Sequence, residues 1–275
     1  VTGFRRVLFR SFTHAYCGTT VCAPSRTSLM TGLHSGHSPI RANREVQPEG
    51  QKPLPAETVT VAQVLRSAGY ATGCFGKWHL TPPWEQGPAG PFDRWPTGMG
   101  FERFYGIIGA EASQYEPPVY DQTTPIHPHL DRPDYHLTED LVDRAIEWID
   151  RVRATAPDRP FFCYLPTPAV HTPHHVPPEW IERFRGRFDA GWDALRAEIF
   201  ERQLALGIIP PGTRATPRPE AIPAWADYPD RYKPVARRLM EVFAAFLAHT
   251  DHHIGRLVEH LDRAGIGEEI GRAHV

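Results

Sequence analysis

The chain has 275 residues, of which 41% are hydrophobic and 23% are charged, and this composition excludes collagen-like and disordered classes of protein. Its formal net charge of -2 gives no overall field that would collect nucleic acid or an acidic membrane surface. No stretch approaches the roughly 20 apolar residues of a membrane-spanning helix, and the four cysteines lack the paired spacing of a disulfide framework.

Both ends of the chain are expected to be non-native. If residues 269–275 are encoded as GAG ATC GGA AGA GCA CAC GTC, the reverse complement reads Arg-Val-Leu-Phe-Arg-Ser in one frame, which is the sequence of residues 6–11. Two termini encoded by opposite strands of one short DNA resemble a sequencing adapter. We therefore expect residues 1–11 and 269–275 to be adapter-derived, and residues 12–268 to be an internal piece of a longer protein.

The first predicted helix lies within residues 21–32 and begins at Pro24, with Cys22 just ahead of it. The thiol would then lie near free backbone N–H groups at the positive end of the helix dipole, which favours an anion there. Arg26 adds a fixed positive charge. These residues alone leave two alternatives open, an activated or anion-handling cysteine and a buried structural cysteine.

A helix over residues 58–68 and a short apolar strand over residues 70–75 come next. The helix has three apolar positions on one face, with Gly69 placed to end it. These positions are Val61, Val64 and Leu65. The strand leads to Lys77 and His79, and a cation beside a titratable ring at a strand end is how anion sites are built in α/β folds. A surface lysine and an edge histidine are the alternative.

The second half of the chain predicts two helices and another strand. Thr138 can N-cap a helix that starts with acidic residues, and residues 161–165 predict a strand buried on both faces. A last helix is expected over residues 234–264, ended by Gly265. Helices that alternate with buried strands predict an α/β layered fold with a mostly parallel sheet, without a repeat or a clear domain linker.

Two groups of histidines are candidate site residues. The strand over residues 161–165 leads to His171, with His174 and His175 as the alternative site residues. On the last helix, His249, His252 and His253 have the spacing of a metal-binding face, but the surrounding apolar residues favour a packing helix.

Two motifs resemble the type I sulfatases. The run Cys22-Ala23-Pro24-Ser25-Arg26, continued to Thr31-Gly32, matches the signature Cys-x-Pro-Ser-Arg-x-x-x-x-Thr-Gly, in which the cysteine is oxidised to formylglycine after translation. Gly76-Lys77-Trp78-His79 matches the second signature. The chain looks most like bacterial arylsulfatases, which implies an alkaline-phosphatase-like α/β fold and assigns residues 12–268 to part of the N-terminal catalytic domain. Residues 36–55 look like another branch of the family, so a join between two genes near Gly69 is a further hypothesis.

The resemblance implies hydrolysis of sulfate esters by a formylglycine hydrate made from Cys22, with transfer of sulfate to the enzyme and then its elimination. In this scheme Arg26 orients the diol and Lys77 neutralises developing charge. His171 protonates the leaving oxygen, and His79 assists the elimination.

The family's metal is normally calcium, which the formylglycine from Cys22 would also contact. The Asp-Asp and Asp-Asn pairs that hold calcium in the family are absent from this chain, so we expect the chain alone to be inactive. The implied partners are a sulfate-ester small molecule or a sulfated glycan, and a formylglycine-generating enzyme during maturation. No nucleic-acid or membrane partner is expected. The sequence does not fix the compartment, and the bacterial cytoplasm or periplasm is the expectation.

Two other functions stay open. One is a phosphatase or phosphodiesterase of the same superfamily, although its members use serine or threonine without the Cys-x-Pro-Ser-Arg signature. The other is a non-catalytic binder of sulfated ligands, in which Cys22 remains unmodified.

Overall fold

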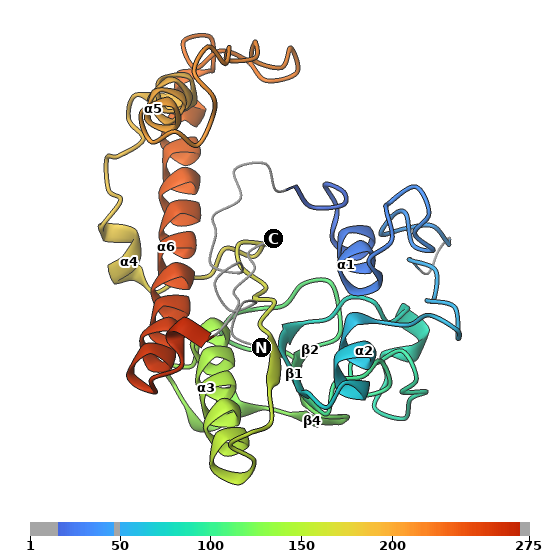
Figure 1. Ribbon diagram of the computed structural model, residues 1–275. Helices are drawn as coiled ribbons and strands as arrows, with labels where there is room; N and C mark the ends of the chain where they lie inside the picture. Colours follow the sequence, from blue (N-terminus) through green and yellow to red (C-terminus); the bar gives the residue numbers. More distant parts are fainter. Residues whose placement is uncertain (1–15, 47–49, 270–275) are drawn as a thin grey trace.

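The computed structural model describes residues 16–46 and 50–269 (Figure 1). Residues 1–11 and 270–275, most of the ends expected to be non-native, lie outside this part. The helices are α1 (Cys22–Thr31), α2 (Val61–Ser67), α3 (Leu137–Thr155), α4 (Pro178–Glu182), α5 (Gly191–Ala205) and α6 (Lys233–Arg263). The strands are β1 (Ala71–Lys77), β2 (Arg103–Ile107), β3 (Val119–Asp121), β4 (Thr124–Ile126) and β5 (Phe161–Tyr164).

The strands form one mixed sheet in the order β4-β3-β2-β1-β5. The central strand β1 is parallel to both β2 and β5. The strands β3 and β4 extend the sheet as an antiparallel hairpin beside β2. The predicted α/β class with parallel strands is confirmed. β2 and the hairpin of β3 and β4 were not predicted, and the hairpin lies inside a proline-rich stretch.

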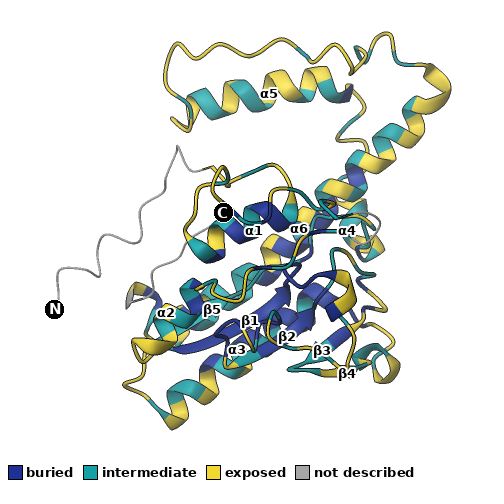
Figure 2. Cartoon of the chain, turned by 90° about the vertical axis from the view of Figure 1, so that its right-hand side faces the viewer, coloured by how far each residue is buried: buried dark blue, intermediate teal, exposed yellow. Residues whose placement is uncertain are grey.

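Helices cover both faces of the sheet. In Figure 1, α3 lies on one side of the strands and α2 on the other, with α1 beside α2. The residues of β1 alternate between the two cores, since Cys74 packs on the α1–α2 side and Phe75 on the α3 side. Burial is concentrated at the sheet and the helices that touch it, whereas α5 stands away from it with mostly exposed residues (Figure 2). None of the helices in residues 16–46 and 50–269 combines the length and hydropathy that a bilayer crossing requires.

Two predicted helices differ in detail from the structure. α2 begins at Val61 because the Thr60 side chain caps it and accepts a hydrogen bond from the Gln63 amide. Val64 was expected on the buried face but is 54% exposed, and the buried residue of α2 is Ala62. Gly69 follows the helix with φ 92°, as the predicted end requires.

α3 is capped by His136, so the prediction of Thr138 as the N-cap was wrong. The His136 Nδ1 atom accepts a hydrogen bond from the Thr138 amide at 3.2 Å. Thr138 is therefore the second residue of the helix and not its cap. The predicted strand over residues 161–165 forms as β5, but the prediction that it is buried on both faces was wrong. β5 is half-exposed along its length because it lies at the edge of the described sheet.

α6 confirms the prediction of a long helix ended by Gly265, which has φ 72°. Its apolar residues do not all face the core. Phe246 and Leu261 are buried, whereas Leu239 and Phe243 in its first half are exposed. The second half of the helix packs against α3, and its first half extends past α4 toward α5 (Figure 1).

Candidate active site

The carboxyl ends of the three parallel strands meet at one edge of the sheet, where open α/β sheets bind ligands. β1 ends at Lys77, with His79 two residues later. Glu111 follows the end of β2, and His171 follows the end of β5. The electrostatic interactions among these residues, and with Cys22 and Arg26 of α1, show that all five predicted side chains and Glu111 lie in one neighbourhood.

Gly76 lets the strands approach closely just before Lys77. It has φ 143°, and a Cβ atom there would lie 2.2 Å from the carbonyl oxygen of Pro166. The Lys77 amide donates a hydrogen bond to that same oxygen at 2.8 Å. A side chain at position 76 would therefore push apart the two strand ends that carry Lys77 and lead to His171.

Cys22 is the first residue of α1, rather than the residue just ahead of the helix. It is half-buried, and the Val21 N-cap gives no side-chain hydrogen bond. The cap comes instead from Asn43, whose Oδ1 atom accepts a hydrogen bond from the Ala23 amide at 3.0 Å. The side chain at position 22 thus lies at the positive end of α1, as the anion-handling interpretation requires.

Arg26 ties α1 to the ends of two strands. Its Nη1 atom donates hydrogen bonds to the Lys77 carbonyl oxygen at 2.7 Å and to the Tyr164 hydroxyl at 3.2 Å. Burial raises the pKa of Tyr164 to about 12, so this hydroxyl stays neutral. Arg26 is consequently held with its positive charge beside Lys77.

The Lys77 side chain is a buried cation within the site. Lys77 is only 2% exposed. Burial and then the Arg26 charge lower the pKa of Lys77, while the charge and a side-chain hydrogen bond of Cys22 and the charge of Glu111 act to raise it. An oxyanion bound beside Lys77, Arg26 and position 22 would stabilise the charged form of Lys77, and these groups therefore favour an anion there.

His79 is buried in a constrained backbone conformation. Its φ of 53° lies in the left-handed region. Its amide donates to the Ile108 carbonyl oxygen at 3.0 Å, and the buried Gln51 donates from Nε2 to the His79 carbonyl oxygen at 3.3 Å. Burial, and then the charges of Lys77, Arg26 and His171, lower the pKa of His79 to about 3. The ring is therefore neutral near neutral pH, and its buried Nδ1 atom has no hydrogen-bond partner among the described residues.

Of the three candidate histidines after β5, His171 is the one whose charge lowers the pKa of His79. Its Nδ1 atom lies 2.8 Å from the Thr172 carbonyl oxygen and 3.5 Å from Glu111 Oε2. The other two pack elsewhere. The His174 ring contacts Phe243 of α6, and the His175 ring stacks on Tyr115.

Of the three candidate histidines of α6, His249 and His253 form a buried pair, and His252 is exposed. The Nε2 atoms of His249 and His253 lie 3.1 Å apart, and Arg256 Nη1 lies 2.9 Å from His253 Nδ1. Because Arg256 can only donate, His253 Nδ1 accepts and its Nε2–H donates to His249. Across residues 16–46 and 50–269, no group of three or more His, Cys, Asp or Glu side chains is arranged to hold a metal ion.

Four residues around the site were not identified from the sequence. Asn43 and Gln51 belong to the stretch of residues 36–55 that looks like another family branch, and its Ile40 and Leu54 are fully buried in the core beside α1. The other two residues are Tyr164 and Glu111. Glu111 could have been identified from the sequence, because it is a charged residue that follows the apolar run of residues 104–108.

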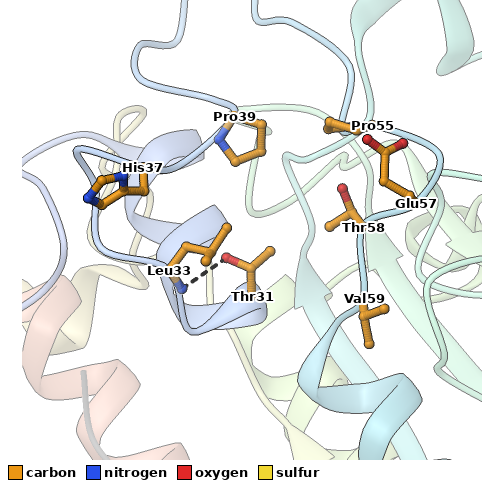
Figure 3. Close-up of a pocket in the computed structure, with 8 residues that line it drawn as sticks. All are labelled: Thr31, Leu33, His37, Pro39, Pro55, Glu57, Thr58 and Val59. Carbon is orange, nitrogen blue, oxygen red and sulfur yellow. Dashed lines mark hydrogen bonds between the residues drawn. The ribbon is translucent and has the colours of Figure 1, made fainter.

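A pocket of about 410 Å³ lies away from this site (Figure 3). Its lining comes from the C-terminal end of α1 and from the segment before α2. The residues are Thr31, Leu33, His37, Pro39, Pro55, Glu57, Thr58 and Val59. Because α1 has ten residues, this end of the helix is about 15 Å from Cys22. The pocket is therefore not the space in front of Cys22.

Comparisons with known proteins agree on one family. The family model described as Sulfatase matches residues 10–270. An uncharacterized sulfatase of Schizosaccharomyces pombe is 29% identical over 270 residues, which cover 90% of this chain and 47% of that protein. An arylsulfatase of Klebsiella aerogenes is 28% identical over 266 residues, covering 91% of this chain and 54% of that protein. The chain thus spans about half the length of these relatives.

Solved structures agree in fold. The structure of yidJ from Bacteroides fragilis superposes with a TM-score of 0.65 at 19% identity, covering 94% of this chain and 52% of that one. A protein solved with its substrate D-glucosamine-2-N,6-O-disulfate gives a TM-score of 0.56 at 18% identity, covering 92% of this chain and 55% of that one. At these identities the likeness establishes the fold alone.

Proposed function

The chain belongs to the sulfatase family, and from this premise we propose that the protein hydrolyses sulfate esters at the carboxyl edge of its parallel strands. One observation carries the proposal, the placement of Cys22 at the N-terminus of α1 beside the buried Lys77 and the fixed Arg26. A helix N-terminus and two cations suit a sulfate group, and the side chain at position 22 faces it.

Position 22 fits the modification that its motif implies. Cys22 is half-buried, at a helix N-terminus and in contact with Lys77, where a reactive polar group would be oriented and partly shielded from water. We propose that a formylglycine-generating enzyme converts Cys22 to formylglycine, whose hydrate supplies the oxygen nucleophile for sulfur.

The cationic side chains bind the sulfate group and stabilise its developing charge. Lys77 is buried, so its charge is little screened by solvent and acts strongly on a sulfate oxygen. Arg26 is held by Lys77 and Tyr164, which keeps α1 and position 22 in a fixed place relative to β1. A preorganised arrangement of this kind lowers the cost of orienting the substrate.

The two histidines have different proton-transfer roles. His79 is neutral near neutral pH, so its ring can accept a hydrogen bond from the hydroxyl at position 22 and in this way assist the elimination of sulfate. His171 keeps a hydrogen on Nδ1 because the Thr172 carbonyl oxygen can only accept. Its Nε2 atom is then the one that gives a proton to the leaving oxygen.

Sulfatases generally combine a metal ion with formylglycine, and calcium is the expected metal. Calcium requires six to eight oxygen ligands, and residues 16–46 and 50–269 contain no acidic, histidine or cysteine group arranged to hold a metal. The residues described therefore do not fit a calcium site by themselves, and no step of the mechanism is assigned to the metal.

Sulfated sugars are included among the candidate substrates because a solved neighbour binds a sulfated glucosamine. The phosphatase alternative shares the tetrahedral substrate geometry, but the intact Cys22-to-Arg26 signature favours sulfate. The binder alternative requires that Cys22 stays a thiol in the mature protein.

The first test is Cys22→Ala in the whole protein, produced together with a formylglycine-generating enzyme. Turnover of an aryl sulfate should fall to background, because the variant lacks the precursor of the nucleophile. The matched control is Cys17→Ala, which changes an exposed cysteine five residues away and should leave turnover unchanged. Undiminished turnover in Cys22→Ala, with both variants folded, would refute the assignment.

A further inference from the structure

We propose that Glu111 is a positioning residue for His171, which holds the imidazole through Nδ1 and stabilises its doubly protonated form. The proton-transfer step rests on the proposed function, whereas the contact between the two side chains does not. Glu111 lies in the loop after β2 and is matched by neither sulfatase signature.

The geometry identifies which nitrogen faces Glu111. The Glu111 Oε2 atom lies 3.5 Å from His171 Nδ1, and the Thr172 carbonyl oxygen lies 2.8 Å from the same atom. The Thr172 hydroxyl also lies 3.4 Å from Nδ1 and could donate to it, but the nearest oxygen, the Thr172 carbonyl at 2.8 Å, and the Glu111 carboxylate can only accept. The shortest contact therefore places the hydrogen on Nδ1. Nε2 is left as the nitrogen that gains and loses the proton.

The loops that carry the two side chains are tied together. His175 Nδ1 lies 3.4 Å from both the Gln114 amide and the Ser113 hydroxyl. His136 Nε2 lies 3.2 Å from the His175 carbonyl oxygen, and the amide of Leu137 donates to Gln114. The segment after β5 and the loop after β2 consequently keep a fixed separation, although both Glu111 and His171 reach solvent.

The charges around Glu111 and His171 favour an ion pair between these two side chains. A carboxylate beside a sulfate site would repel the substrate unless a cation neutralises it. The charged or titratable groups of the described residues that face this part of the site are Cys22, Arg26, Lys77 and His79, besides Glu111 itself. Within residues 16–46 and 50–269, the acidic side chain that lies within ion-pair distance of His171 is Glu111, and this places a carboxylate directly against the imidazole.

The proton balance follows from this arrangement. As the oxygen supplied at position 22 forms a bond to sulfur, the S–O bond of the ester breaks, its electron pair goes to the leaving oxygen, and that oxygen takes the proton from His171 Nε2. The imidazole is left neutral with its hydrogen on Nδ1, still facing Glu111 and Thr172. A proton from solvent returns to Nε2 before the next turnover.

The direct test needs neither formylglycine nor metal and uses the chain as it is. Nitrogen NMR spectra of isotopically labelled histidine report which ring nitrogens carry hydrogen, and His171→Asn assigns the His171 signals. At about pH 6.5, where histidines commonly titrate, Glu111→Gln should lower the ratio of doubly protonated to neutral His171 by about two- to fivefold, the range of an exposed ion pair. Glu116→Gln is the matched control, because Glu116 is exposed in the same loop, and it should leave the ratio unchanged.

A kinetic test then separates positioning from a merely structural role. In the matured whole protein, Glu111→Gln should lower kcat more for a sulfate ester with a poor leaving group than for an activated nitrophenyl sulfate, because only the former depends on protonation. An unchanged His171 proton ratio in Glu111→Gln would overturn the proposal. A wild-type protein that turns over no sulfate ester would instead refute the proposed function, while the NMR comparison still decides the role of Glu111.

Discussion

Buried histidines recur in this molecule, and each is neutral because burial disfavours its charged form. Burial is the first cause that lowers the pKa of His79 and His249 to about 3 and of His136 and His253 to about 4. Since the unfolded chain binds protons to these rings below about pH 6.5, the stability that they contribute is complete above that pH. It is lost as the pH falls from there toward the folded-state pKa values.

His136 gives this pH dependence a single-residue test. Its Nδ1 accepts from Thr138 and its Nε2 faces the His175 carbonyl oxygen, so a second proton on the ring would break the cap of α3. His136→Asn keeps a capping side chain without a titratable ring. Between about pH 6.5 and pH 4.5 the variant should lose roughly 2 kcal/mol less unfolding free energy than the wild type. Urea unfolding at the two pH values measures this difference.

The control for that comparison is His34→Asn, which changes an exposed histidine. It should follow the wild-type pH dependence. Equal pH dependence in His136→Asn and the wild type would show that His136 does not couple folding to protons.

Among individual site residues, those that lie within local sequence motifs were predictable. Cys22, Arg26, Lys77 and His79 lie in two short signatures, and the structure brings them together at the edge of the sheet. Gln51, like Asn43 and Tyr164, was not predictable in this way, because its contact with His79 depends on where a distant loop packs.

Among the elements, α3 is anchored through one buried carboxylate in its first turn. Asp140 is 1% exposed, and its oxygens accept hydrogen bonds from the hydroxyls of Tyr105 on β2 and Tyr135. Arg132 and Arg144 lie 3.3 and 3.5 Å from its Oδ1 atom. The network fastens the helix to the sheet on the side opposite α2, and its charge is compensated by two cations.

Asp140→Ala should destabilise the protein by about 3–5 kcal/mol, the cost of removing one partner from a buried charge network. Glu139→Ala is the control, because Glu139 is a half-exposed acid in the same helical turn, and removing it should cost at most about 1 kcal/mol. Chemical unfolding of the two variants measures both values. Equal and small costs would contradict the role given to the network.

Elements with strong periodicity were predictable, as α6, α3 and β1 show, although α3 has another N-cap and β1 extends to Lys77 rather than ending at residue 75. β2 was missed because it has only five residues in a stretch rich in glycine and aromatic residues. β3 and β4 have three residues each, and β4 contains Pro125, so their pairing comes from the neighbouring β2 rather than from local pattern. The edge position of β5 is likewise a property of the sheet that the strand's own apolar sequence does not reveal.

For the whole molecule, the parallel arrangement of β2, β1 and β5 explains why the site exists where it does. Parallel strands deliver their carboxyl ends to one edge, so Glu111, Lys77 and His171 converge although they are far apart in the sequence. The N-terminus of α1 faces the same edge through Arg26, which adds Cys22 to the group. The proposed chemistry thus follows from the topology together with two local motifs.

The central claim is that this edge acts on sulfate esters. Its most direct test is the ratio of kcat/KM for nitrophenyl sulfate to kcat/KM for nitrophenyl phosphate, measured on the whole protein after maturation with a formylglycine-generating enzyme. The sulfate ester should be the better substrate. Preference for the phosphate ester would contradict it and favour a phosphatase of the same superfamily.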